Sequence, residues 1–129
     1  MDIRELSKQS AARVKAHDRE GWINLFAEDG FVQDPVGPSQ LDPEGKGHHG
    51  HAAIGRFYDM AIAPNKDVTF AYHNSIVCGN ECANVVTMHI TTGDGHKLDV
   101  PAVIVYKQAP NGKLASLRAF WSLDNVPGF

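Results

Sequence analysis

The feature that most constrains the fold is a change of pattern near residue 66. Four later segments (68–77, 83–92, 97–107 and 114–123) are rich in Val, Ile and other strand-forming residues. Gly- and Asn-containing turn signals separate them: GNE at 79–81, GDG at 93–95 and PNG at 110–112. Strand-forming runs divided by such turns predict an antiparallel meander.

The first half has a different periodicity. Apolar residues recur at close to a helical period over residues 3–26, with a break near Asp18, and again over 51–62. A short strand at 31–36 is expected to stop at Pro35, and the Gly- and Pro-rich segment 37–50 reads as a loop. Helices followed by a meander predict an α+β fold with helices on one face of a curved antiparallel sheet. Such a sheet, closed at one end by helices, leaves a concave apolar pocket, where small ligands usually bind.

Composition excludes several classes of protein. The 129 residues favour one domain, 1–129, and the net charge of -3 argues against nucleic acid as a partner. No run approaches the ~20 apolar residues of a membrane helix, and the polar start does not resemble a signal peptide. Two cysteines, Cys78 and Cys82, without such a peptide favour a cytoplasmic protein.

Asp34 is the leading candidate for chemistry. It lies between Val32 and Pro35 in an apolar strand that must end there. Partial desolvation would raise the pKa and the basicity of this carboxylate, which suits proton abstraction next to a carbonyl. The alternative is that the Asp34 side chain only caps a turn.

Three stretches resemble the ketosteroid isomerase family. Residues 25–37 (LFAEDGFVQDPVG) are similar to the family's helix end, turn and strand, in which the catalytic aspartate precedes Pro-Val-Gly. Residues 50–58 (GHAAIGRFY) resemble its third helix, and residues 112–121 (GKLASLRAFW) its last strand. The resemblance implies a cone-shaped α+β barrel of the nuclear-transport-factor-2-like and SnoaL-like proteins, with no cofactor.

The resemblance also implies roles for single residues. Asp34 takes the place of the general base, Tyr58 matches a tyrosine supporting the oxyanion network, and Trp121 matches an aromatic residue of the pocket wall. In that family a tyrosine and a protonated aspartic acid bind the oxyanion. Here the tyrosine's place falls near Ser10 and the acid's place falls at Val103 or Ile104. Packing alone is the other interpretation of Tyr58 and Trp121.

Strand parity predicts the pocket wall. If Met88 faces inward, then Val86 and Ile90 do so too. The proposed substrate-binding residues are Phe26, Met88, Ile90, Val103, Leu117, Ala119 and Trp121. Such a lining favours a flat apolar ligand, steroid- or terpenoid-like.

The histidine-rich loop is the other feature that could indicate chemistry. His48, His49 and His51 lie among glycines, without the cysteines or carboxylates at defined spacing that zinc sites usually add. No metal site is expected, and the loop is interpreted as a mobile flap at the pocket mouth.

The sequence therefore predicts a cofactor-free isomerase, steroid delta-isomerase-like, that shifts a C=C bond in an apolar enone. One alternative is a non-catalytic protein that binds a hydrophobic ligand. Another is a different reaction in the same pocket: hydration, cyclisation, or epoxide hydrolysis using Arg118 with Asp99 or Asp124. A homodimer is expected through the outer sheet face and a last strand with Leu114, Leu117 and Phe120.

Overall fold

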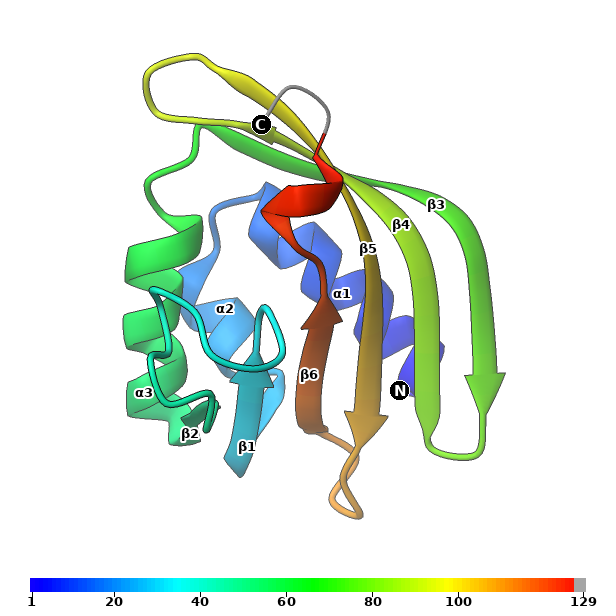
Figure 1. Cartoon of the computed structure of the whole chain (residues 1–129). Helices are drawn as coiled ribbons and strands as arrows, with labels where there is room; N and C mark the ends of the chain where they lie inside the picture. Colours follow the sequence, from blue (N-terminus) through cyan, green and yellow to red (C-terminus); the bar gives the residue numbers. More distant parts are fainter. Residues whose placement is uncertain (127–129) are drawn as a thin grey trace.

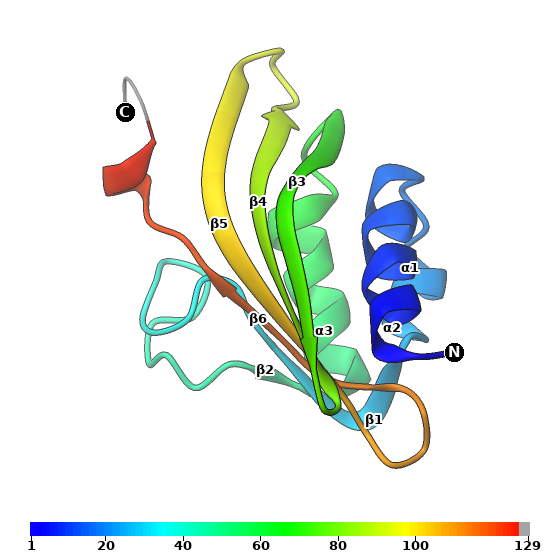
Figure 2. The same ribbon diagram turned by 90° about the vertical axis from the view of Figure 1, so that its right-hand side faces the viewer.

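The computed structural model describes residues 1–126 and shows a curved sheet with helices on one side (Figures 1 and 2). The helical elements are α1 (Ile3–Lys15), α2 (Arg19–Ile23), α3 (Gly50–Phe57), the π-helical turn η1 (Tyr58–Ile62) and the 3-10 turn η2 (Leu123–Asn125). The strands are β1 (Phe26–Gln33), β2 (His48–His49), β3 (Asp67–Cys78), β4 (Glu81–Thr91), β5 (Lys97–Gln108) and β6 (Leu114–Phe120). The predicted α+β class and the cone-like arrangement are confirmed.

Capping residues define the first two helices. The Asp2 side chain accepts a hydrogen bond from the Glu5 amide at the start of α1, and Asp18 does the same for Gly21 at the start of α2. The predicted break at Asp18 is therefore a new helix start. Helix α1 packs across β3, β4 and β5, while α3 packs against β1.

The sheet order is β2-β1-β6-β5-β4-β3. The last four strands form the expected antiparallel meander, but β1 pairs with β6 in parallel, with Gln33 opposite Arg118. The expectation of a purely antiparallel sheet is corrected here. Because parallel strands end at the same edge, the residues that follow β1 and β6 are brought together.

Two local expectations also change. Strand β1 begins at Phe26, not near Phe31, because Phe26 pairs with Leu114 ahead of a bulge. The loop after β1 contains the short strand β2, in which His49 pairs with Phe31. The His48–His49 end of this loop is therefore held against the sheet.

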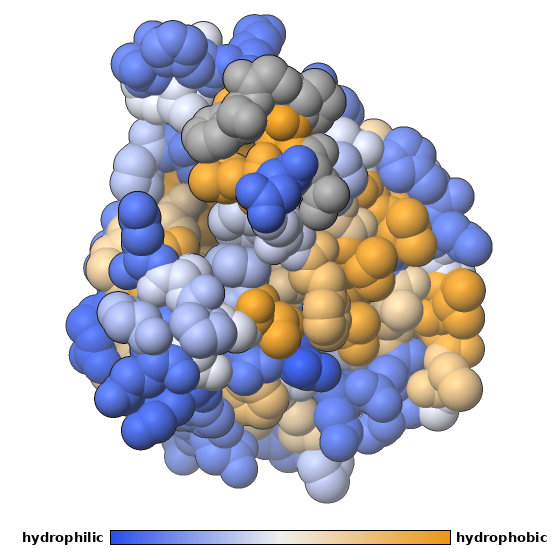
Figure 3. Space-filling model, viewed as in Figure 1, coloured by the Kyte–Doolittle hydropathy of each residue, from blue (hydrophilic) through white to orange (hydrophobic). Residues whose placement is uncertain are grey.

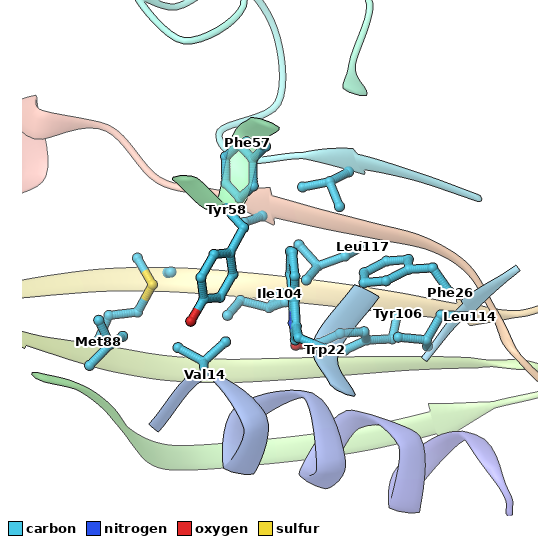
Figure 4. Close-up of a cluster of buried hydrophobic side chains, with 14 of the residues drawn as sticks. Val14, Trp22, Phe26, Phe57, Tyr58, Met88, Ile104, Tyr106, Leu114 and Leu117 are labelled. Atoms are coloured by element: carbon cyan, nitrogen blue, oxygen red, sulfur yellow. The ribbon is translucent and has the colours of Figure 1, made fainter. Parts of the chain in front are cut away.

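An aromatic cluster anchors α2 to the rest of the core. Trp22 meets Phe26 edge to face, with ring centroids 5.1 Å apart, and lies 6.3 Å from Phe57 and 5.8 Å from Tyr58. Trp22 and Tyr106 lie between α1 and the strands in Figure 4. This cluster fixes the inner end of the hollow between helices and sheet.

Candidate active site

A cavity of about 230 Å³ lies between the helices and the concave face of the sheet. This volume is somewhat below the range of common ligand pockets, which favours a flat, compact ligand or one that extends through the mouth. Apolar side chains dominate the lining. They are Val14, Leu41, Phe57, Met60, Ala61, Ile62, Val68, Phe70, Met88, Ile90, Ile104 and Leu117. The polar or polar-tipped lining residues are Ser10, Trp22, Asp34, Asn65, Tyr106 and Trp121.

Asp34 lies on the cavity wall directly after β1. The parallel pairing of β1 with β6 brings it to Trp121, whose indole Nε1–H donates to the Asp34 carboxylate at 2.5 Å. Burial raises the pKa of Asp34 above its ordinary value of 3.8, and the Trp121 hydrogen bond partly opposes that rise. Its only side-chain hydrogen bond within residues 1–126 is this one, so Asp34 does not cap a turn.

Replacing Asp34 by asparagine is expected to stabilise the protein at neutral pH. Because burial raises the folded-state pKa of Asp34, the folded chain binds this proton more tightly than the unfolded chain. That stabilisation is complete below the unfolded pKa and is lost as pH rises through the folded pKa. Above the folded-state pKa the wild type holds a charge on this half-buried carboxylate, and the amide removes that charge while its oxygen still accepts from Trp121.

Thermal denaturation of Asp34→Asn and wild type checks this expectation. At pH 7 the variant should melt a few degrees higher, at roughly 4 °C per kcal/mol for a domain of this size. The difference should shrink as pH falls through the raised folded-state pKa of Asp34, and it should be smallest below the ordinary value of 3.8. Equal melting temperatures at pH 7 would contradict a desolvated Asp34.

Three side chains meet at the inner end of the cavity. The Ser10 Oγ atom accepts a hydrogen bond from Trp22 Nε1 at 3.0 Å and lies 2.9 Å from the Tyr106 hydroxyl. All three residues are at most 4% exposed. Burial raises the pKa of Tyr106, and the negative charge of Asp34 adds to the rise, so the phenol stays neutral.

The structure divides the predicted wall residues into two groups. Met88, Ile90, Leu117 and Trp121 line the cavity. Phe26 and Ala119 are fully buried in the surrounding core and do not line it.

Val103 does not line the cavity, contrary to the prediction. It lies on the outer face of the sheet opposite Phe120, and both side chains are exposed. Side chains alternate along β5, so the neighbouring Ile104 faces the cavity instead.

Tyr58 also lies elsewhere than expected. Its phenol is 3% exposed and packs beside Trp22, but it is not among the cavity-lining side chains. Within residues 1–126 its hydroxyl has no hydrogen-bond partner, and Asp34 bonds Trp121 instead. This placement matches the packing interpretation of Tyr58 and does not support a catalytic role for it.

The three histidines of the loop contact three different partners. His48 packs on Phe57, with ring centroids 5.0 Å apart, while His49 contacts the Lys46 carbonyl and His51 the Phe26 carbonyl. Across the described part of the chain, no three or more His, Cys, Asp or Glu side chains are grouped to hold a metal ion. The loop does reach the cavity, through Leu41.

The residues considered for epoxide hydrolysis do not converge. Arg118 donates to Gln33 at 2.8 Å, while Asp99 pairs with His89 on an exposed part of the sheet. None of Arg118, Asp99 and Asp124 lines the cavity with Asp34. The geometry therefore gives no support to an Asp-Arg-Asp mechanism.

Sequence reasoning missed the hydroxyl of Tyr106 and the indole of Trp22. Tyr106 could have been predicted as a cavity residue. Residues two apart on a strand share a face, and Ile104 is one of the two positions that the resemblance gives for the acid. Trp22 had no such signal, since a tryptophan on a helix stripe is ordinarily core.

The comparisons with known proteins agree with this geometry. The model of the SnoaL-like domain family matches residues 8–117. The chain therefore belongs to the SnoaL-like domain family. None of the helices in residues 1–126 combines the length and apolar character needed to cross a membrane.

Two mycobacterial structures are similar over nearly the whole chain. RV0760c from Mycobacterium tuberculosis, in complex with estradiol-17beta-hemisuccinate, is 32% identical with a TM-score of 0.88, and the match covers 96% of each chain. The Delta 5-3-ketosteroid isomerase from Mycobacterium sp. is 31% identical with a TM-score of 0.89, covering 96% of this chain and 95% of that one.

A more distant structure shares the fold alone. The epoxide hydrolase/cyclase-like enzyme SalBIII is 21% identical with a TM-score of 0.80, and the match covers 96% of this chain and 93% of that one.

Proposed function

We propose that this protein is a cofactor-free isomerase that shifts a C=C bond in an apolar ketosteroid-like enone, with Asp34 as the general base. The observation that carries the proposal is a desolvated carboxylate on the wall of an otherwise apolar cavity. Desolvation raises basicity, and a raised pKa brings a carboxylate closer to what a proton-abstracting base needs near neutral pH.

The proposed reaction moves one proton between two carbons. Asp34 takes the proton from the carbon between the carbonyl and the double bond, and the electrons of that C–H bond form a dienolate. The carboxylic acid then returns the proton to the far carbon of the original double bond. The Trp121 N–H stays bonded to the carboxylate and fixes its orientation.

The similarities to known structures support this substrate class. One of the similar structures is a Delta 5-3-ketosteroid isomerase, and another is in complex with estradiol-17beta-hemisuccinate. A steroid is flat, apolar and compact, as the cavity requires.

A non-catalytic steroid-binding protein is the second candidate, favoured by the apolar residues Val103 and Ile104 at the two positions that the resemblance gives for the isomerases' acid. Incubating wild-type protein with a Δ5-3-ketosteroid and following the conjugated enone by its ultraviolet absorbance separates the two. Saturable enone formation above the buffer rate supports the isomerase. Steroid binding without enone identifies the binding protein and ends the isomerase proposal.

We also propose a homodimer formed through the outer face of the sheet. Exposed apolar side chains on this face include Val85, Val103 and Phe120, and apolar areas are visible over these strands in Figure 3. Contiguous exposed apolar patches mark association surfaces. Leu114 and Leu117 are buried and face inward, so they do not take part as expected.

Phe120→Asp is expected to weaken this dimer at least about 30-fold, the effect of about 2 kcal/mol at an interface centre. Sedimentation equilibrium measures the dissociation constant. Met60→Asp changes an exposed apolar side chain at the cavity mouth and should leave the constant unchanged. A wild type that is monomeric at high concentration would contradict the proposed interface.

A further inference from the structure

The buried cluster of Ser10, Trp22 and Tyr106 leaves one hydroxyl proton without an acceptor. An indole N–H can only donate, so the Trp22 proton must point at Ser10 Oγ. Tyr106 donates one further hydrogen bond from its hydroxyl to Ser10 Oγ, at 2.9 Å. The two hydroxyls have two protons between them, and this bond uses one.

The remaining proton has no protein partner. Over residues 1–126, neither hydroxyl makes a further hydrogen bond. Both residues line the cavity, so the free O–H adjoins the space that a ligand would fill. A buried donor without an acceptor costs about 1–3 kcal/mol, which a ligand oxygen at this point would recover.

The geometry of the cluster makes this proton a strong donor. In the arrangement where Tyr106 donates to Ser10, the Ser10 oxygen accepts two hydrogen bonds, from Trp22 and Tyr106. Each accepted bond polarises the hydroxyl, and the effect is strengthened away from water.

We propose that the Ser10–Tyr106 pair, held by Trp22, is the site that binds the carbonyl oxygen of the ligand and stabilises the charge that develops on it. This inference rests on the proposed isomerase function. It identifies the hydrogen-bond donors for the ligand oxygen, which the Asp34 base does not supply. The ligand class is an apolar ring system with an acceptor oxygen at the end that enters first.

The position of the pair agrees with the position of the base. Ser10 and Tyr106 line the same cavity as Asp34, and the Asp34 charge acts on Tyr106 through that cavity. A ligand with its oxygen on the pair therefore shares the cavity with the Asp34 carboxylate. When Asp34 removes the carbon-bound proton, the dienolate oxygen receives the negative charge and the hydroxyl pair donates to it, without giving up a proton.

Ser10→Ala and Tyr106→Phe test the site, with Ser7→Ala as the matched control. Ser7 is a buried serine on the same helix, bonded to Asn84 at 2.6 Å, and it does not line this cavity. Each test variant is expected to lower kcat for the Δ5-3-ketosteroid by about 10²–10³-fold, the usual loss for one oxyanion donor. The double variant should lose less than the product of the single losses, because the two hydroxyls act as one unit. Circular dichroism and the melting temperature show whether each variant is folded.

A binding measurement without turnover completes the test. Calorimetric titration compares estradiol with its 3-deoxy analogue, which lacks the phenolic oxygen on carbon 3. Wild type and Ser7→Ala should prefer estradiol by at least about tenfold, and both test variants should lose that preference. If the wild type binds but does not isomerise, this preference still supports the oxygen site while the isomerase proposal fails. If folded test variants keep both kcat and the preference, the oxygen site is wrong while Asp34 can still be the base.

Discussion

Replacing Asp34 by asparagine is expected to lower kcat for a Δ5-3-ketosteroid by about 10²–10⁴-fold, the contribution typical of a positioned general base. The amide has nearly the same shape as the carboxylate and can still accept from Trp121, but it cannot take up a proton. Steroid affinity should therefore be retained or increased, because the buried charge is gone. The measurement is enone formation together with calorimetric titration of the steroid.

Asp29→Asn is the matched control for this substitution. Asp29 is an exposed carboxylate on the same strand, outside the cavity. The control should turn over the steroid at the wild-type rate. Equal losses in the two variants would show that the effect does not belong to the cavity, and retained turnover in Asp34→Asn would remove Asp34 from the mechanism.

Filling the cavity mouth is expected to have the other large effect. Ala61 lies on η1, is half-buried and lines the cavity, so a tryptophan at this position would occupy much of a space of about 230 Å³. We expect Ala61→Trp to raise the steroid dissociation constant at least about 100-fold, or roughly 2.8 kcal/mol. Because Ala61 is not fully buried, the larger side chain should not disrupt the core.

Ala63→Trp controls for the added indole. Ala63 is exposed just after η1 and does not line the cavity. Calorimetric titration should give wild-type affinity for this variant. An Ala61→Trp variant that binds as tightly as the control would place the steroid outside this cavity.

The sequence predicted much of the architecture because its signals are local. Turns at 79–81, 93–95 and 110–112 separate the strands of the meander, and the strand ranges agree within a few residues. The parallel pairing of β1 with β6 places Gln33 opposite Arg118, 85 positions further along the chain. A local sequence pattern does not predict so distant a pairing partner. That long-range pairing is what brings Trp121 to Asp34.

The candidate site was predictable in part for the same reason. The resemblance marked Asp34 and Trp121, and strand parity marked Met88 and Ile90 as cavity residues. The Ser10–Tyr106 contact joins a helix to a strand across the core, so it depends on packing that the sequence pattern does not encode.

The most direct test of the central claim is to follow a single deuterium. The claim is that one half-buried carboxylate, Asp34, carries a proton between two carbons of the bound steroid. A Δ5-3-ketosteroid deuterated at the carbon between the carbonyl and the double bond is converted in ordinary water, and the enone is analysed by mass spectrometry and NMR. We expect deuterium at the far carbon of the original double bond, because the bound steroid covers the half-buried carboxyl group of Asp34 and slows its exchange with solvent. A product that carries only solvent hydrogen at that carbon would contradict the account.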